Sequence, residues 1–475
     1  MVDLHNYLSE ISALPGKMAR QHSRALFWES RTFHGITDNK DHHPSCATTL
    51  LQTRTINFRL ILVCLAAASV GLPVAIVSIA KVLLLLGGAA ILVFSRDREL
   101  VDQQTYSVGA TKFAILLALA AFSVSLAWTT ASLSEALGSL AKYGKLLMIP
   151  MIVALVRSRK EAICALGTFA LVQLFLVISS WMLFFHMPVP WATSPTVARL
   201  TYAVFSSYLD QGIMTTVFAA LCWQFRGWIP GKFGTRHAAL IVAIALLNVF
   251  IVLIGRTGHV IAIALISLAI MWELPRRYRL GVVLLPVALL LVVSAIVPKV
   301  QQRVEQVRLE VSGFSFDKGV SVNSGNSAGI RLHFWHRAIQ SITEHPVSGA
   351  GIGSWSSEFN RLEKQKNASP ESIAPMGNPH QEYLLWGVQL GIPGILLIFG
   401  IFIAIFRDAL DMDVLAARAT QSVLLAFAIA CLFNSVIYDA LIGDFFCVTM
   451  GLLLALGSHP PEQTAIKYPE PGHTA

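Results

Sequence analysis

The sequence predicts an all-α, polytopic membrane protein with about 12 transmembrane helices and one large loop that carries short helices. Three observations predict this fold. Hydrophobic residues make up 55% of the 475 residues, and charged residues make up 13%, about half the share in an average soluble domain. The mean hydropathy is +0.63, and apolar runs close to twenty residues long recur along the chain. These values exclude a soluble enzyme.

The apolar runs divide the chain into five regions. Residues 1–57 form a polar tail without a recognisable cleavable signal peptide, which we expect to be cytoplasmic and disordered. Residues 58–297 contain predicted transmembrane helices 1–9, and residues 383–458 contain helices 10–12. Residues 298–382 form the large loop, and residues 459–475 form a second cytoplasmic tail. The spans are expected at residues 59–75, 77–95, 112–129, 136–156, 161–185, 212–225, 238–254, 259–273, 280–297, 383–405, 420–436 and 440–457.

Lysine and arginine indicate which side each connection faces. They are concentrated in alternate connections, at residues 95–99, 157–160, 226–236, 275–279 and 406–418. Because basic loops stay in the cytoplasm, both termini are expected there, and residues 186–211, 255–258 and 298–382 face the opposite side. The formal charge of +9 is explained by this anchoring, so no nucleic-acid partner is expected.

The large loop contains a Ser/Gly-rich stretch at 312–329, which predicts a flexible segment. The next stretch predicts an amphipathic helix lying on the membrane surface, because its apolar residues recur at helical spacing: Ile330, Leu332, Trp335, Ile339 and Ile342. The glycines of "SGAGIGSW" (348–355) predict a tight turn after that helix, since no preceding strand supports a dinucleotide-binding site.

The segment "GNPHQEYLLWGVQLGIPG" (377–394) places a histidine where the large loop enters the tenth span. Asn378 is a favourable N-cap, Pro379 suits the first helical position, and Gln381 completes a pattern like a capping box. His380 would then lie in the first helical turn, where the helix dipole favours a neutral imidazole that can accept a proton. Gly387, with Gly391, is expected to permit close helix packing. The alternative is a histidine that merely caps a helix at the interface.

Arg256 and Arg199 are isolated basic residues on the predicted outer side. Guanidinium groups bind phosphate oxygens in pairs, so the two could hold a diphosphate beside a helix N-terminus. Each could instead be an interfacial anchor. Lys142 and Lys145 fall within the fourth predicted span, where an ionisable residue suggests a function, although snorkelling or a buried structural pair would also explain them. Arg331, with Arg337, is predicted on the surface helix, where a solvated face competes with phosphate or headgroup binding.

The outer segments contain no DxD pair, no His/Glu cluster with metal spacing and no GxSxG motif. We therefore expect neither a metal nor another cofactor, and a chemistry in which a neutral histidine is the base and arginines stabilise a phosphate leaving group.

Three motifs together resemble the O-antigen ligase family, within the wider ligase/polymerase superfamily of bacterial envelope glycosyltransferases: "GRTG" at 255–258, "HPVSGAGIGSW" and "NPHQEYLLWGVQLGIPG". The similarity covers residues 112–457 in layout. It implies a GT-C-like inner-membrane protein of a Gram-negative bacterium, with 12 spans and a periplasmic loop before the tenth. Gln381 and Gln389 depart from the family pattern, which often has asparagine and glutamate there.

The resemblance implies transfer of an O-antigen polysaccharide from undecaprenyl diphosphate to a sugar hydroxyl of lipid A–core, at the periplasmic face and without metal or nucleotide. His380 would be the base, and Arg256 and Arg199 would bind the diphosphate. An O-antigen polymerase, or an oligosaccharyltransferase acting on proteins, would use the same donor. A polysaccharide transporter is a fourth possibility, but the chain shows no internal repeat, and its polar candidates gather at one membrane face.

Overall fold

In this computed structural model, the described residues are 46–94, 108–228, 233–288, 327–365 and 377–461, together with residues 291, 301, 305 and 309. Thr55–Ala475 form one compact unit, and it is this unit that is described below. Met1–Arg54 form a second unit, of which residues 1–45 are not described. Most of the predicted N-terminal tail, and residues 462–475 of the C-terminal tail, therefore lie outside the described residues.

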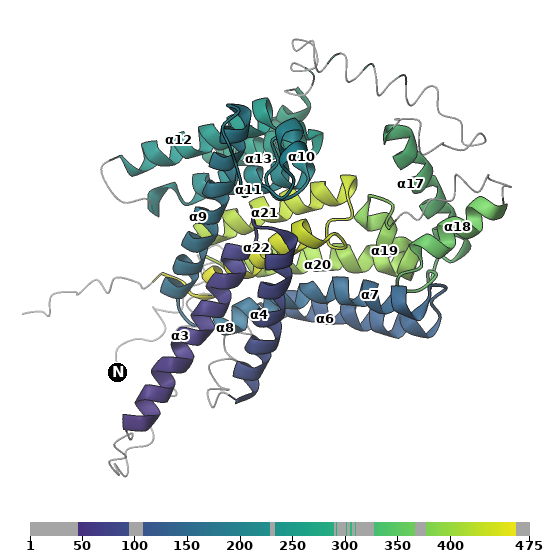
Figure 1. Ribbon diagram of the computed structural model, residues 1–475, viewed down its shortest axis with the longest axis horizontal. Helices are drawn as coiled ribbons and strands as arrows, with labels where there is room; N and C mark the ends of the chain where they lie inside the picture. Colours follow the sequence, from purple (N-terminus) through teal and green to yellow (C-terminus); the bar gives the residue numbers. More distant parts are fainter. Residues whose placement is uncertain are drawn as a thin grey trace, which may run out of the picture. The chain divides into compact units, whose positions relative to one another are not determined.

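The described part of the chain is entirely helical, without strands (Figure 1). Its α-helices are α3 (Cys46–Ser69), α4 (Val74–Phe94), α6 (Gly109–Val124), α7 (Leu133–Tyr143), α8 (Met148–Leu155), α9 (Arg159–Phe184), α10 (Pro195–Thr201), α11 (Tyr208–Gln224), α12 (Gly234–Leu247), α13 (Arg256–Glu273), α14 (Arg279–Val283), α17 (Ser327–Glu344), α18 (Trp355–Gln365), α19 (Glu382–Leu390), α20 (Ile392–Leu410), α21 (Val414–Phe433) and α22 (Ala440–Ser458).

Nine helices within the described residues are long and apolar enough to cross a membrane. Two further predicted spans correspond to shorter helices: α11 has 17 residues, and the apolar part of α3 is Phe58–Ser69. The predicted span at 280–297 lies partly outside the described residues. The predicted fold class, an all-α polytopic membrane protein, is confirmed.

Helix α22 forms the centre of this unit, and Figure 1 shows it with α21, in yellow, in the middle of the other helices. Of its apolar stretch, 89% is buried, and it packs against α8, α21, α9 and α4. Small residues permit this close packing, since a Cβ added at Gly451 would lie 3.0 Å from Ile152. A helix that is apolar on all sides is expected at such a position.

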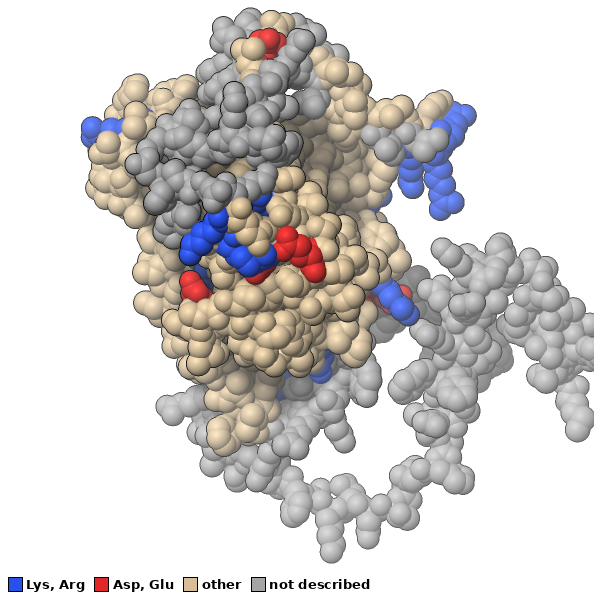
Figure 2. Space-filling model, turned by 90° about the vertical axis from the view of Figure 1, so that its right-hand side faces the viewer, with Lys and Arg blue, Asp and Glu red and all other residues tan. Residues whose placement is uncertain are grey.

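Helix α17 confirms the helix predicted in the large loop, and its position on the membrane surface stays a prediction. Its buried side chains include Phe334, Ala338 and Ile342, which pack against α18 and α19, whereas Ile339 is 51% exposed. The face with Phe334, Ala338 and Ile342 is thus covered by protein, because α18 folds back onto it after the glycine-rich turn. Figure 2 views the side that carries these helices; one group of charged side chains, of both signs, lies near the middle, and others lie at the edges.

The predicted span at 383–405 is divided into α19 and α20 at Gly391. Gly391 has φ +68°, and a Cβ there would lie 2.5 Å from the carbonyl oxygen of Pro346. Only Gly387 has the expected packing role, since a Cβ there would lie 2.5 Å from Ile342. The glycine-rich turn at 345–354 is confirmed, with positive φ at Gly349, Gly351 and Gly353.

Candidate functional site

His380 lies two residues before the start of α19, and the predicted first-turn position was wrong. The side-chain oxygen of Asn378 accepts a hydrogen bond from the backbone N–H of His380 at 2.9 Å. This local turn places His380 in the left-handed region, with φ 53°, so Pro379 cannot begin the helix. Gln381 is the N-cap instead, and its side chain accepts a hydrogen bond from the N–H of Leu384.

The half-buried His380 ring is oriented by Asn434. The Nδ1 atom of His380 lies 3.2 Å from the side-chain oxygen of Asn434, and the side chain of Asn434 also hydrogen-bonds Asp439. An amide that donates its N–H to a carboxylate presents its oxygen to the imidazole, so Nδ1 carries the proton. Nε2 then has a free lone pair and can accept a proton.

Asp439, the N-cap residue of α22, is hydrogen-bonded to Asn434 on the side away from His380's Nδ1 contact. It accepts a hydrogen bond from the Nδ2 atom of Asn378 at 3.2 Å. Burial raises the pKa of the Asp439 carboxyl, and the neighbouring His380 and Lys145 oppose that rise by favouring its charged form. The two asparagines therefore connect the histidine turn to a carboxyl group.

The segment 434–439 is held from two sides. The Oε2 atom of the buried Glu382 accepts hydrogen bonds from the backbone N–H groups of Ile437 and Tyr438, at 2.8 and 3.3 Å. The Nζ atom of Lys145 donates to the carbonyl oxygens of Asp439 and Ala440, at 2.5 and 3.3 Å. These contacts fix the backbone that carries Asp439.

Lys145 is 2% exposed, and the fourth predicted span bends to accommodate it. The span is divided into α7, a short 3₁₀ segment at Gly144–Leu147, and α8. Lys145 Nζ also lies 3.9 Å from a carboxylate oxygen of Asp444, which pairs with Lys81 at 2.8 Å. Gly443 leaves room for the ammonium group, because a Cβ there would lie 2.8 Å from Nζ.

Lys142 is exposed and lies beside the same segment. Its Nζ atom is 3.8 Å from the centroid of the Tyr438 ring, a cation–π contact. The hydroxyl of Tyr438 lies 3.2 Å from that of Ser139. Both predicted accessory lysines are therefore brought next to the segment that contacts His380.

Arg256 and Arg331 form the second part of the site. Arg256 is the first residue of α13, and the preceding Gly255 packs so closely on Tyr208 that an added Cβ would lie 3.0 Å from its carbonyl oxygen. Burial lowers the pKa of Arg331, the positive charge of Arg256 lowers it further, and Tyr208 opposes the shift. Within the described residues, neither arginine has a hydrogen bond or an ion pair with an acid. Two guanidinium groups within electrostatic range of each other, with no carboxylate partner among the described residues, are suited to an anion such as a diphosphate.

The first turn of α11 interacts electrostatically with residues of both parts of the site. Tyr208 interacts with Arg331, and Asp210 lies within range of charge repulsion from Asp439. Arg199 is not brought to this site by any contact in the described residues. It is exposed on the seven-residue helix α10 and has no hydrogen bond or ion pair to a described residue.

Three site residues were missed in the sequence: Asn434, Asp439 and Glu382. Asp439 could have been found in the sequence, because it is an isolated acid in the short turn between the last two predicted spans, as Arg256 is an isolated base in an outer turn.

Arg337, in contrast, is not available to phosphate. It is 2% exposed, and its Nε atom donates to Glu363 Oε1 at 2.5 Å.

One group in the described part of the chain has the spacing of a metal site: Glu344, His345 and Glu358. Arg361 already forms ion pairs with both of these carboxylates. The protein itself thus supplies one positive charge between the two acids.

The fold and the site together define a polytopic, all-helical membrane protein in which two arginines lie within electrostatic range of each other and a half-buried histidine is held by an asparagine. A model of the O-antigen ligase family matches residues 240–399, which contain Arg256, Arg331 and His380. This match covers roughly a third of the chain and confirms the resemblance seen in the sequence. A search of curated proteins gives no match.

Proposed function

We propose that this protein is an O-antigen ligase, which transfers a polysaccharide from undecaprenyl diphosphate to a sugar hydroxyl of lipid A–core at the periplasmic face of the inner membrane. The family match supports ligase- or polymerase-type glycosyl transfer in general. The observation that carries the specific proposal is the combination of the Arg256–Arg331 pair with the free Nε2 of His380.

In the proposed reaction, the acceptor hydroxyl gives its proton to Nε2 of His380 while its oxygen attacks the anomeric carbon of the donor sugar. The bond from that carbon to the diphosphate oxygen breaks, and the electron pair leaves with the diphosphate. Arg256 and Arg331 stabilise the developing charge on the leaving group. Asn434 holds the imidazole through Nδ1, and the Asp439 carboxylate favours the imidazolium that forms.

These assignments extend the prediction from the sequence in one respect. Arg331 takes the place beside Arg256 that was expected for Arg199, because Arg331 is the arginine within electrostatic range of Arg256. A role of Arg199 in diphosphate binding stays a prediction.

A deletion strain tests the proposal through its lipopolysaccharide and its lipid-linked glycan. Loss of the O-antigen ladder, with full-length polysaccharide accumulating on the lipid carrier, is the expected result. Accumulation of single repeat units would show a polymerase instead. An unchanged ladder, with loss of glycan on a protein, would show an oligosaccharyltransferase and reject the ligase.

A further inference from the structure

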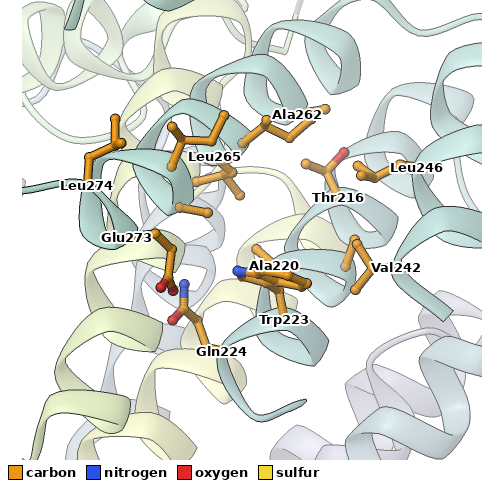
Figure 3. A pocket seen from close by; sticks show the side chains of 14 residues that line it. Thr216, Ala220, Trp223, Gln224, Val242, Leu246, Ala262, Leu265, Glu273 and Leu274 are labelled. Atoms are coloured by element: carbon orange, nitrogen blue, oxygen red, sulfur yellow. The ribbon is translucent and has the colours of Figure 1, made fainter. Parts of the chain in front are cut away.

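A second candidate binding site lies between α11, α12 and α13 (Figure 3). The pocket has a volume of about 300 Å³, and nearly all of its lining is apolar. Figure 3 shows the side chains of Glu273 and Gln224 next to each other at one end, with Thr216 and Leu246 on the opposite side. Two of its three walls, α12 and α13, are among the membrane-crossing candidates, so the surrounding medium is lipid rather than water.

The pocket is lined by α13 from its seventh residue, Ala262, to its C-terminal end, and not by the first turn that carries Arg256. Helix α13 has 18 residues, which corresponds to a length of about 27 Å, close to the thickness of the hydrocarbon core. Arg256 begins the helix, whereas the pocket is lined from Ala262 to Leu274. A lipid whose head lies at the Glu273 end therefore belongs to the leaflet opposite to Arg256.

The polar end of the pocket carries one positive and one negative charge. Arg226 Nη2 lies 3.0 Å from the Glu273 carboxylate, and its guanidinium stacks 4.4 Å from the centroid of the Trp223 ring. Their side chains are 27% and 52% exposed, so both groups can also reach a ligand. Guanidinium has donors left for phosphate oxygens, and the carboxylate can accept from an ammonium group. Tryptophan at this depth is typical of the membrane interface.

We infer that this pocket binds one acyl chain of a zwitterionic glycerophospholipid of the phosphatidylethanolamine type, with its phosphate on Arg226 and its ammonium on Glu273. The apolar lining suits a hydrocarbon chain, and the exposed rim at Ile270 and Glu273 gives lateral access from the bilayer. An anionic phospholipid fits the polar end less well, since it would leave Glu273 facing a negative head group without an ammonium. This site is independent of the proposed transfer reaction.

Native mass spectrometry of the full chain tests the inference. The protein is released from nanodiscs that contain equal amounts of dioleoyl-phosphatidylethanolamine and dioleoyl-phosphatidylglycerol, and the retained lipid is identified. One retained phosphatidylethanolamine, in clear excess over phosphatidylglycerol, is expected. Equal retention of the two lipids would overturn the inference, and so would retention of a polyprenyl diphosphate in place of a phospholipid. This measurement needs no variant.

Two matched substitutions then locate the site. Ala269 lines the pocket and Ala243 is exposed on α12 outside it, so A269F fills the pocket whereas A243F adds the same ring elsewhere. A269F should lower retention about tenfold, and A243F should not change it. E273Q should reduce the preference for phosphatidylethanolamine about two- to fivefold, the effect of one exposed charge pair. Equal retention by A269F and A243F would overturn the assignment to this pocket.

Discussion

Two groups in this protein contain a histidine, a carboxylate and nearby cations. They differ in the hydrogen bonding of the Nε2 atom of the histidine. On α17 and α18, Nε2 of the buried His333 is 2.8 Å from Glu363 Oε1, which also accepts from Arg337. In the turn before α19, His380 is half-buried and contacts an asparagine, with the carboxylate one residue further away. In the first group Nε2 joins two helices and Nδ1 is buried, whereas in the second group Nε2 belongs to a half-buried ring and has no hydrogen bond among the described residues.

The arginines on α17 show the same difference. Arg337 is neutralised by a buried carboxylate, whereas Arg331, less than two turns earlier, lies beside a second arginine. An arginine paired in this way stabilises the fold, and an arginine next to a like charge is suited to an incoming anion. The comparison therefore separates structural from functional residues of the same type on one helix.

The largest expected effect concerns the two histidines. H380A should lower turnover by about 10²- to 10⁴-fold, because the base is lost, while the protein still inserts and keeps its melting temperature. H333A is the matched control, which should lower the melting temperature and leave most of the turnover. Glycan transfer in membranes from the two variants, with thermal melts of both, checks this. Near-normal turnover of H380A would leave His380 without a catalytic role.

Loss of the buried ion pair should be the largest effect on stability. R337M leaves the Glu363 carboxylate without its guanidinium partner, which should cost about 3–5 kcal/mol of unfolding free energy. Denaturation in detergent measures this change, and R331M serves as the control because Arg331 has no such partner among the described residues. Equal destabilisation by R331M and R337M would contradict the distinction drawn on α17.

Replacement of the arginine pair should have a smaller effect on activity. R256K and R331K keep the positive charge but lose the bidentate hydrogen bonding of a guanidinium group. Each should reduce the rate of glycan transfer about 10- to 100-fold. The reduction should appear mainly with the lipid-linked donor, measured at varied donor and fixed acceptor. R199K provides a comparison, since Arg199 has no contact with the pair. A greater loss with R199K than with R331K would restore the assignment made from the sequence.

The smallest expected effect is a pH dependence of stability. Burial lowers the pKa of His333, so the unfolded chain binds a proton that the folded chain resists. Its contribution to stability is therefore fully present above the ordinary histidine pKa of about 6.5 and is lost as the pH falls below it. Melting temperatures of the wild type between pH 7.5 and 5.5 should fall more steeply than those of H333Q. Parallel curves would show that His333 does not titrate in this way.

The sequence predicted the features that depend on periodicity and charge. Long apolar runs identified the membrane helices, and helical spacing identified α17. The start of α19 was predicted too early because two local arrangements compete for the same residues. Asn378 can cap a helix or form a side-chain turn, and the choice depends on Gln381, whose longer side chain caps α19.

The partners within the site depend on tertiary structure and could not be read from spacing. Arg331 lies within electrostatic range of Arg256, which is 75 residues earlier in the sequence. Asn434 connects Asp439 to His380, and these two residues are 59 positions apart. From the sequence, Arg199 was the candidate for diphosphate binding and Arg331 only an accessory residue of the predicted surface helix. The structure distinguishes them differently, since Arg331 lies within electrostatic range of Arg256.

The break at Gly391 has a mechanical consequence. Helix α20 is long enough to cross the bilayer, so it must tilt when the hydrocarbon thickness changes. Helix α19 has nine residues and is anchored separately, through the hydrogen bond from the N–H of Ala350 to Val388 and through Glu382. A change of tilt would then alter the angle between α19 and α20 at Gly391. The His380 turn would keep its position relative to Asp439 in membranes of different thickness.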